Sequence, residues 1–214
     1  MESRGYHQHC GLARALDRLG ERWTLLIVRE LLLGPRRYSQ MLDSLQGITT
    51  NLLAKRLKSM QAQGILEKLG SGPATRYRLS PLGALLEPAV MELARWGGNF
   101  MATACDADRR DLSWALLSLK RRYAGGMEFR VGISIEQRSF ELLFERDKLW
   151  VQEREAVDPH LHLTGTEDEL FVLLFQSHWS PGLRVEQRGQ ALAQWCQAVQ
   201  VTPPERQQRG PVGS

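Results

Sequence analysis

Residues 47–61 of the chain read GITTNLLAKRLKSMQ, and this stretch decides how the first half folds. Its apolar residues recur at the spacing of one helix face, and its cations fall on or beside the other face. The apolar set is Leu53, Leu57 and Met60, and the cationic set is Lys55, Arg56 and Lys58. A solvated helix surface is the ordinary explanation of such a charge run. The flanking sequence decides between that explanation and a binding surface.

The flanking sequence predicts a helix-turn-helix followed by a wing. Gly34 and Pro35 end an apolar helix, Gly47 marks a tight turn, and Thr49 or Thr50 can cap the basic helix. The expected order is an apolar helix over 12–33, a short helix over 37–45, the basic helix to about 63, and a hairpin of strands at 65–69 and 75–80. A further helix should run from Pro81 to about residue 100, with a kink at Pro88.

This order predicts which residues contact DNA. In a winged helix-turn-helix the second helix enters the major groove and the hairpin lies along the backbone. Asparagine pairs with adenine and lysine reaches guanine, whereas side chains that open the preceding helix usually hold phosphates. The arginines of the wing suit backbone or minor-groove contact. The predicted DNA-contacting residues are Arg36, Arg37, Tyr38, Ser39, Thr49, Thr50, Asn51, Lys55, Arg56, Lys58, Arg76 and Arg78.

The first half also resembles a known family. The opening at Cys10 and the motifs LGERWTLLIVREL, GPRRYSQM, GITTNLLAKRLK and YRLSPLG together resemble the HxlR family of bacterial transcription regulators, over residues 10–96. The resemblance implies a homodimer, built from the N-terminal segment and the helix after the wing. It further implies that the dimer binds a two-fold-related operator in double-stranded DNA.

The charge distribution places the nucleic-acid surface in the first half. The 214 residues carry a net charge of +4. Residues 1–100 hold 14 Lys+Arg and 8 Asp+Glu, which is +6, so the remainder is −2. Three widely spaced cysteines, Cys10, Cys105 and Cys196, do not indicate a disulfide framework. The start MESRGYHQHC lacks an apolar signal core, and no run is long and apolar enough for a bilayer, so we expect a cytoplasmic protein with no membrane partner.

The second half predicts a separate α/β unit. Alternating strands, a glycine turn and helices follow one another, and the stretches LHLTGTEDELFVLL and LRVEQRGQALAQW resemble a sterol-carrier-protein-like domain over residues 111–200. That resemblance implies an α/β sandwich with an apolar cavity, although QSHWSPG is shorter than the usual connection. The expected fold class is therefore α+β. The expected parts are a winged helix-turn-helix domain (1–102), a sterol-carrier-like ligand-binding domain (111–203) and a disordered tail (204–214).

Aromatic residues of the second half are candidates for the wall of such a cavity. They are bulkier than a small sandwich needs, although packing into the core is the alternative for each. The candidate ligand-binding residues are Trp114, Phe129, Phe171, Phe175, Trp179 and Trp195. Because these walls would be apolar, the expected ligand is a hydrophobic small molecule.

Cys10 is a second candidate sensor. It lies near His7, His9 and Arg14, and nearby positive charge favours the thiolate that oxidants attack. Some HxlR members use a cysteine at this motif position as a redox or electrophile sensor. The alternatives are a half-buried residue at a dimer contact, or a metal site with the two histidines, for which no matching ligand set appears elsewhere.

The sequence predicts a ligand-responsive transcription regulator. No nucleophile–base set and no phosphate-binding loop appears, so we expect no catalytic residues, no enzyme activity, no cofactor and no metal. Its expected partners are operator DNA, a second copy of the chain and a hydrophobic effector. The alternatives are a regulator that senses electrophiles through Cys10, and a lipid carrier, against which the basic first half argues.

Overall fold

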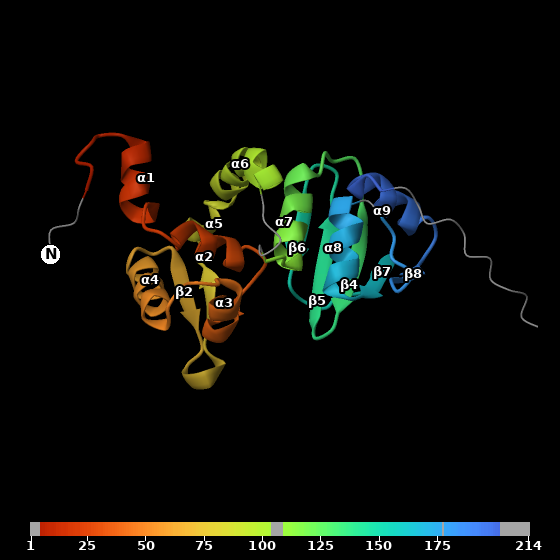
Figure 1. The fold of residues 1–214 in the computed structure, drawn as a ribbon, viewed down its shortest axis with the longest axis horizontal. Helices are drawn as coiled ribbons and strands as arrows, with labels where there is room; N and C mark the ends of the chain where they lie inside the picture. The colour runs from red at the N-terminus through yellow and green to blue at the C-terminus, as the bar shows by residue number, and fades with distance from the viewer. Residues whose placement is uncertain (1–4, 104–108, 177, 202–214) are drawn as a thin grey trace, which may run out of the picture. The chain divides into compact units, whose positions relative to one another are not determined.

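The computed structural model describes residues 5–103, 109–176 and 178–201 (Figure 1). The chain divides into two compact units, Met1–Thr103 and Ala104–Ser214. The tail predicted to be disordered (204–214) and Cys105 lie outside the described residues. Every helix in the described ranges is too short or too polar to cross a membrane.

The first unit contains the predicted winged helix-turn-helix. Its strands form an antiparallel sheet in the order β1-β3-β2, and the turn between β2 and β3 is the wing. The elements are α1 (Gly11–Leu19), α2 (Thr24–Leu31), β1 (Arg36–Arg37), α3 (Tyr38–Ser44), α4 (Thr50–Ala62), β2 (Leu66–Leu69), η1 (Gly72–Ala74), β3 (Arg76–Leu79), α5 (Pro81–Ala84), α6 (Glu87–Gly97) and η2 (Gly98–Thr103). Strand β1, which joins the wing sheet, was not expected from the sequence.

The single helix predicted over residues 12–33 is wrong, because the structure breaks it into α1 and α2. Gly20 ends α1 by donating its backbone N–H to the carbonyl of Leu16 at 2.8 Å. Trp23 then adopts a left-handed backbone conformation with φ of 80°, and α2 begins at the next residue. A periodic apolar pattern continues across this turn, so the sequence alone did not reveal the break.

The kink predicted at Pro88 is also wrong. The chain forms separate helices α5 and α6, and Pro88 lies in the first turn of α6. At that position the missing backbone N–H would have no partner within the helix, so proline is tolerated without distortion. Ser80 caps α5 as predicted, since its side chain accepts a hydrogen bond from the Gly83 N–H at 3.0 Å.

Apolar side chains from every part of the helix-turn-helix meet in one core. Helix α4 contributes the apolar face that the sequence predicted. Its three residues, Leu53, Leu57 and Met60, are each at most 2% exposed. The buried core residues are Ile27, Val28, Leu31, Met41, Leu45, Ile48, Leu53, Leu57, Met60, Ile65 and Leu66. Because one face of α4 is fixed in this core, its opposite face is fixed toward solvent.

The second unit is one five-stranded sheet with helices. The strand order is β6-β5-β4-β7-β8, in which β4 and β7 are parallel and the other neighbours are antiparallel. The elements are α7 (Leu112–Arg122), β4 (Phe129–Ile135), β5 (Arg138–Phe144), β6 (Leu149–Gln152), β7 (Leu161–Gly165), α8 (Glu167–Gln176), β8 (Arg184–Gln187) and α9 (Ala191–Val199). The strands and helices that the sequence predicted for this half are present.

The helices of the second unit lie on one face of its sheet (Figure 1). The alternation predicted for the central strands is confirmed, because one side-chain set is buried against these helices. That set is Phe129, Val131 and Ile133 of β4 and Phe140, Leu142 and Phe144 of β5. The ring of Trp195 on α9 meets Phe144 edge-on, with centroids 6.2 Å apart. These contacts build a core that is separate from that of the first unit.

Candidate nucleic-acid interface

Helix α4 presents a polar, cationic face to solvent. Asn51, Lys55 and Lys58 are exposed, whereas Leu53 and Leu57 on the other side are buried. Neither lysine makes an ion pair within the described ranges. The helix therefore offers unneutralised charges and an amide that can hydrogen-bond with a base edge.

The first turn of α4 is held by hydrogen bonds. Thr49 is the N-cap, as predicted, and its hydroxyl accepts a hydrogen bond from the Leu52 N–H at 3.3 Å. The Tyr38 hydroxyl, from the start of α3, donates to the Thr50 carbonyl at 2.6 Å. Tyr38 thus positions the recognition helix, in addition to the phosphate contact predicted for it.

Arg56 is the one cation of the predicted α4 set that already has a partner. Its guanidinium donates to the carboxylate of Glu21, in the turn between α1 and α2. The Arg56 side chain is 14% exposed, whereas that of Glu21 is 66% exposed. The sequence did not indicate Glu21 as this partner, because 35 positions separate it from Arg56.

Arg36 does not lie on the DNA-facing surface, which corrects the prediction that it contacts DNA. Its side chain is buried, and its Nη1 lies 3.3 Å from Oε2 of the buried Glu30. The same carboxylate accepts a hydrogen bond from the Ser44 hydroxyl at 2.8 Å and pairs with Arg29 at 2.8 Å. Glu30 therefore joins α2, β1 and α3, and Arg36 belongs to this internal network.

The start of α3 and the wing supply the remaining side chains that were predicted to contact DNA. Arg37 and Ser39 are exposed, and the Arg37 backbone N–H donates to the Gln40 side chain at 2.8 Å, which fixes the first turn of α3. On the wing, Arg76 is exposed, whereas Arg78 donates from Nε to Glu67 at 2.8 Å across the strand pair. Exposed pairs of this kind contribute little, so Arg78 can exchange its partner for a phosphate.

The predicted ligand-binding aromatics separate into two groups. Phe129 and Trp195 are 3% and 0% exposed and belong to the packed core around Phe144. Phe171 and Phe175 stack on each other along α8, with centroids 4.4 Å apart, and Phe175 is 45% exposed. The prediction that Phe129 and Trp195 line a cavity has no support in this packing. Trp114 and Trp179 are half-buried.

The cysteines of the described residues have opposite environments. Cys10 is exposed at the N-cap of α1. Cys196 is buried on α9, and burial raises the pKa of its thiol, which lowers its reactivity at neutral pH. His7 and His9 are exposed near Cys10, and within residues 5–103, 109–176 and 178–201 no three His, Cys, Asp or Glu side chains are placed to share a metal ion.

Fold and surface together define the first unit as a winged helix-turn-helix DNA-binding domain. Residues 18–104 match the family model described as HxlR-like helix-turn-helix. The HTH-type transcriptional regulator YodB of Bacillus subtilis is 30% identical over 101 residues, covering 44% of this chain and 90% of YodB. The chain belongs to the HxlR-like helix-turn-helix family.

Other similar proteins share the same region. The HTH-type transcriptional regulator Rv3095 of Mycobacterium tuberculosis is 38% identical over 93 residues, covering 42% of this chain. This chain spans only 58% of the length of that relative. The structure of quinone-bound YodB is 29% identical and covers 42% of this chain and 97% of its own, with a TM-score of 0.37. Since the family match ends at residue 104, the sterol-carrier-like type of the second unit stays a prediction.

Proposed function

We propose that this protein is a transcriptional regulator that binds a two-fold-related DNA operator as a homodimer, with the outward face of α4 in the major groove. The observation that carries the proposal is the exposed set of Asn51, Lys55 and Lys58 on a helix whose opposite face is buried. Asparagine reads a base edge, and the lysines bind phosphates or guanine. Arg37 and Arg76 add cations on α3 and the wing.

Substitutions on α4 test this proposal. Lys55→Ala should weaken operator binding and reduce the slope of log K against log salt by about 0.9, the value for one lost phosphate contact. Asn51→Ala should instead lose about 1–3 kcal/mol of discrimination at one base pair. Binding is measured by fluorescence anisotropy at several salt concentrations, with a duplex selected from random DNA.

Lys148→Ala, the same substitution in the second unit, is the matched control and should bind the operator like the parent. Lys148 lies over the ring of Trp150, outside the helix-turn-helix. Parental affinity, salt dependence and base preference in both α4 variants would show that another surface binds DNA.

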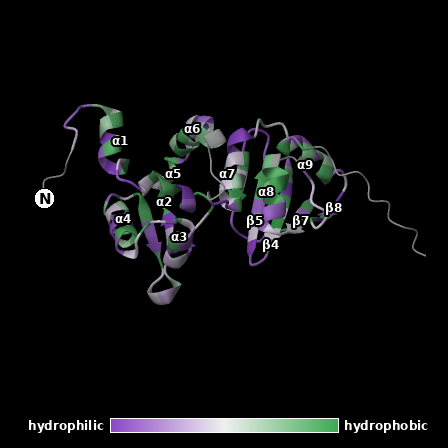
Figure 2. Cartoon of the chain, viewed as in Figure 1, coloured by the Kyte–Doolittle hydropathy of each residue, from purple (hydrophilic) through white to green (hydrophobic). Residues whose placement is uncertain are grey.

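An exposed apolar surface supports the homodimer. Leu93, Trp96 and Phe100 follow the spacing of one helix face along α6 and η2, and Trp96 is 65% exposed. Leu12 and Leu16 expose further apolar surface on α1. Figure 2 shows hydrophobic residues along α1, α5 and α6, and in Figure 1 α1 and α6 lie on the side of this unit opposite the wing. Monomeric proteins rarely expose contiguous patches of this kind. A monomer in sedimentation velocity at micromolar concentration would contradict the dimer.

We further propose that the second unit reports a small-molecule effector to the DNA-binding unit. It has its own core, and residues 101–214 carry a net charge of −2, which disfavours DNA contact. An effector changes operator affinity only if it binds the DNA-competent and incompetent states with different affinity. The half-exposed stack of Phe171 and Phe175 is the surface that supports the hydrophobic effector expected from the sequence.

Cys10 supports a second candidate function, in which the regulator senses electrophiles. With Cys105 replaced by serine, a maleimide should modify Cys10 in the folded protein and spare Cys196, because only Cys10 is exposed. Under this function p-benzoquinone changes operator affinity of the parent, and Cys10→Ser binds the operator normally but does not respond. A quinone response that persists in Cys10→Ser would exclude Cys10 as the sensor.

A further inference from the structure

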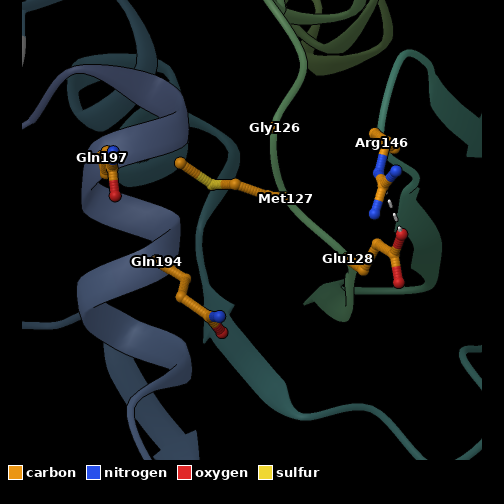
Figure 3. Close-up of a pocket in the computed structure, with 6 residues that line it drawn as sticks. All are labelled: Gly126, Met127, Glu128, Arg146, Gln194 and Gln197. Atoms are coloured by element: carbon orange, nitrogen blue, oxygen red, sulfur yellow. Dashed lines mark ion pairs between the residues drawn. The ribbon is translucent and has the colours of Figure 1, made fainter.

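A polar pocket of about 430 Å³ lies in the second unit, where α9 faces the segment before β4 (Figure 3). In Figure 3, Gln194 and Gln197 come from α9 on one side, Glu128 and Arg146 lie on the other, and Met127 reaches across toward the helix. Gly126 completes the lining. The volume falls within the range of about 300–1,000 Å³ that small-molecule sites occupy.

The wall formed by residues 124–128 is held in place. The Tyr123 hydroxyl accepts a hydrogen bond from the Met127 N–H at 3.1 Å and donates to the Glu145 carbonyl at 3.0 Å. The Gly126 N–H donates to the Arg146 carbonyl at 2.6 Å. Gly125 has φ of +89°, and a Cβ there would lie 2.6 Å from that same carbonyl oxygen, so only glycine fits. A wall that is already ordered loses little entropy when a ligand binds.

The two charged groups of the pocket are only loosely paired. Nε of Arg146 lies 3.8 Å from Oε1 of Glu128, and the two side chains are 87% and 72% exposed. An exposed pair of this kind contributes little to stability. A ligand that carries both a carboxylate and an ammonium group can therefore replace one weak ion pair with a pair to each side chain.

The opposite wall supplies neutral hydrogen-bonding groups. Gln194 and Gln197 are three residues apart and so lie on the same face of α9. Both side chains are exposed, and within the described ranges neither side-chain amide is hydrogen-bonded to another residue. Each amide offers two N–H donors and a carbonyl acceptor, which match a hydroxyl or amide on a ligand. The flexible side chain of Met127 can adapt to the shape of a bound ligand.

We propose that this pocket binds an α-amino acid with a polar side chain. A single carbon separates the carboxylate and the ammonium group of such a ligand, so its carboxylate pairs with Arg146 while its ammonium group pairs with Glu128. Its side chain then faces Gln194 and Gln197. None of the lining residues is aromatic, so the ligand class differs from the hydrophobic effector expected from the sequence. Any regulatory effect of this ligand rests on the sensing role proposed above.

Isothermal titration calorimetry of the full chain against each standard amino acid and glycylglycine tests the proposal. At least one polar amino acid should bind the parent saturably. Arg146→Gln should weaken that binding about 10- to 100-fold, the range for a hydrogen bond to a charged group. The double variant Gln194→Ala/Gln197→Ala should weaken it as well. Arg184→Gln, the same change on the exposed strand β8, should bind like the parent.

Two outcomes would overturn the proposal. One is that no amino acid with a polar side chain binds the parent at millimolar concentration, whether or not glycylglycine or an apolar amino acid binds. The other is that binding survives both pocket substitutions, or is lost equally in Arg184→Gln, since the site would then lie elsewhere or reflect net charge alone. Operator binding is measured on the same variants without amino acid, so that a failure of the pocket is separated from a failure of the DNA-binding function.

Discussion

Replacing Glu30 by alanine should lower the free energy of unfolding of the first unit by about 3–5 kcal/mol, the usual cost of breaking a buried ion pair. The Glu30 side chain is 0% exposed, and its carboxylate contacts the buried guanidinium of Arg36 and the hydroxyl of Ser44. Removing the carboxylate leaves a buried charge without its counter-ion. Because Glu30 joins α2, β1 and α3, operator affinity should fall together with stability.

Hydrogen exchange with mass spectrometry measures this effect, because peptides from each unit are followed separately in one full-length chain. Glu92→Ala is the control, since Glu92 pairs with Arg95 at 3.3 Å while both side chains are at least 60% exposed. Such a pair contributes about 0–1 kcal/mol. A loss below about 1 kcal/mol in Glu30→Ala would show that the network is not coupled to folding.

Trp195→Ala should destabilise the second unit by about 3–5 kcal/mol, the range for removing a large aromatic side chain from a core. Trp195 is 0% exposed and meets Phe144, which in turn stacks on Phe129 with centroids 4.4 Å apart. The substitution leaves a cavity that this packed cluster fills only in part. The unfolding of the first unit should be unchanged, because its core shares no residue with this one.

Trp150→Ala is the matched control, because Trp150 is 39% exposed on β6 and its loss leaves little buried space. The same exchange measurement follows both variants. If Trp195→Ala leaves the second unit as stable as the parent, Trp195 is a wall of an open cavity, as predicted from the sequence, and not part of the core.

The position of the recognition helix was predictable because its signals are local. The spacing of Leu53, Leu57 and Met60 indicated the buried face of the helix, and Thr49 indicated its N-cap. The strands of the second unit followed in the same way from alternating side chains. The break between α1 and α2 was missed because apolar periodicity runs through Trp23, whose backbone is left-handed and whose side chain packs against the core of the first unit.

The sequence by itself determined the helix-turn-helix, the wing and the basic character of the first half. It also determined the succession of helices and strands along the second half. The tertiary structure alone decided which cations are exposed to solvent. Arg36 and Arg37 are neighbours in the sequence, yet only Arg36 turns inward, to the buried Glu30. Arg56 is likewise committed to Glu21 from a distant turn. Local periodicity reports which face of an element is buried, whereas ion pairs and pockets join residues far apart in the chain, and only the folded backbone brings those together.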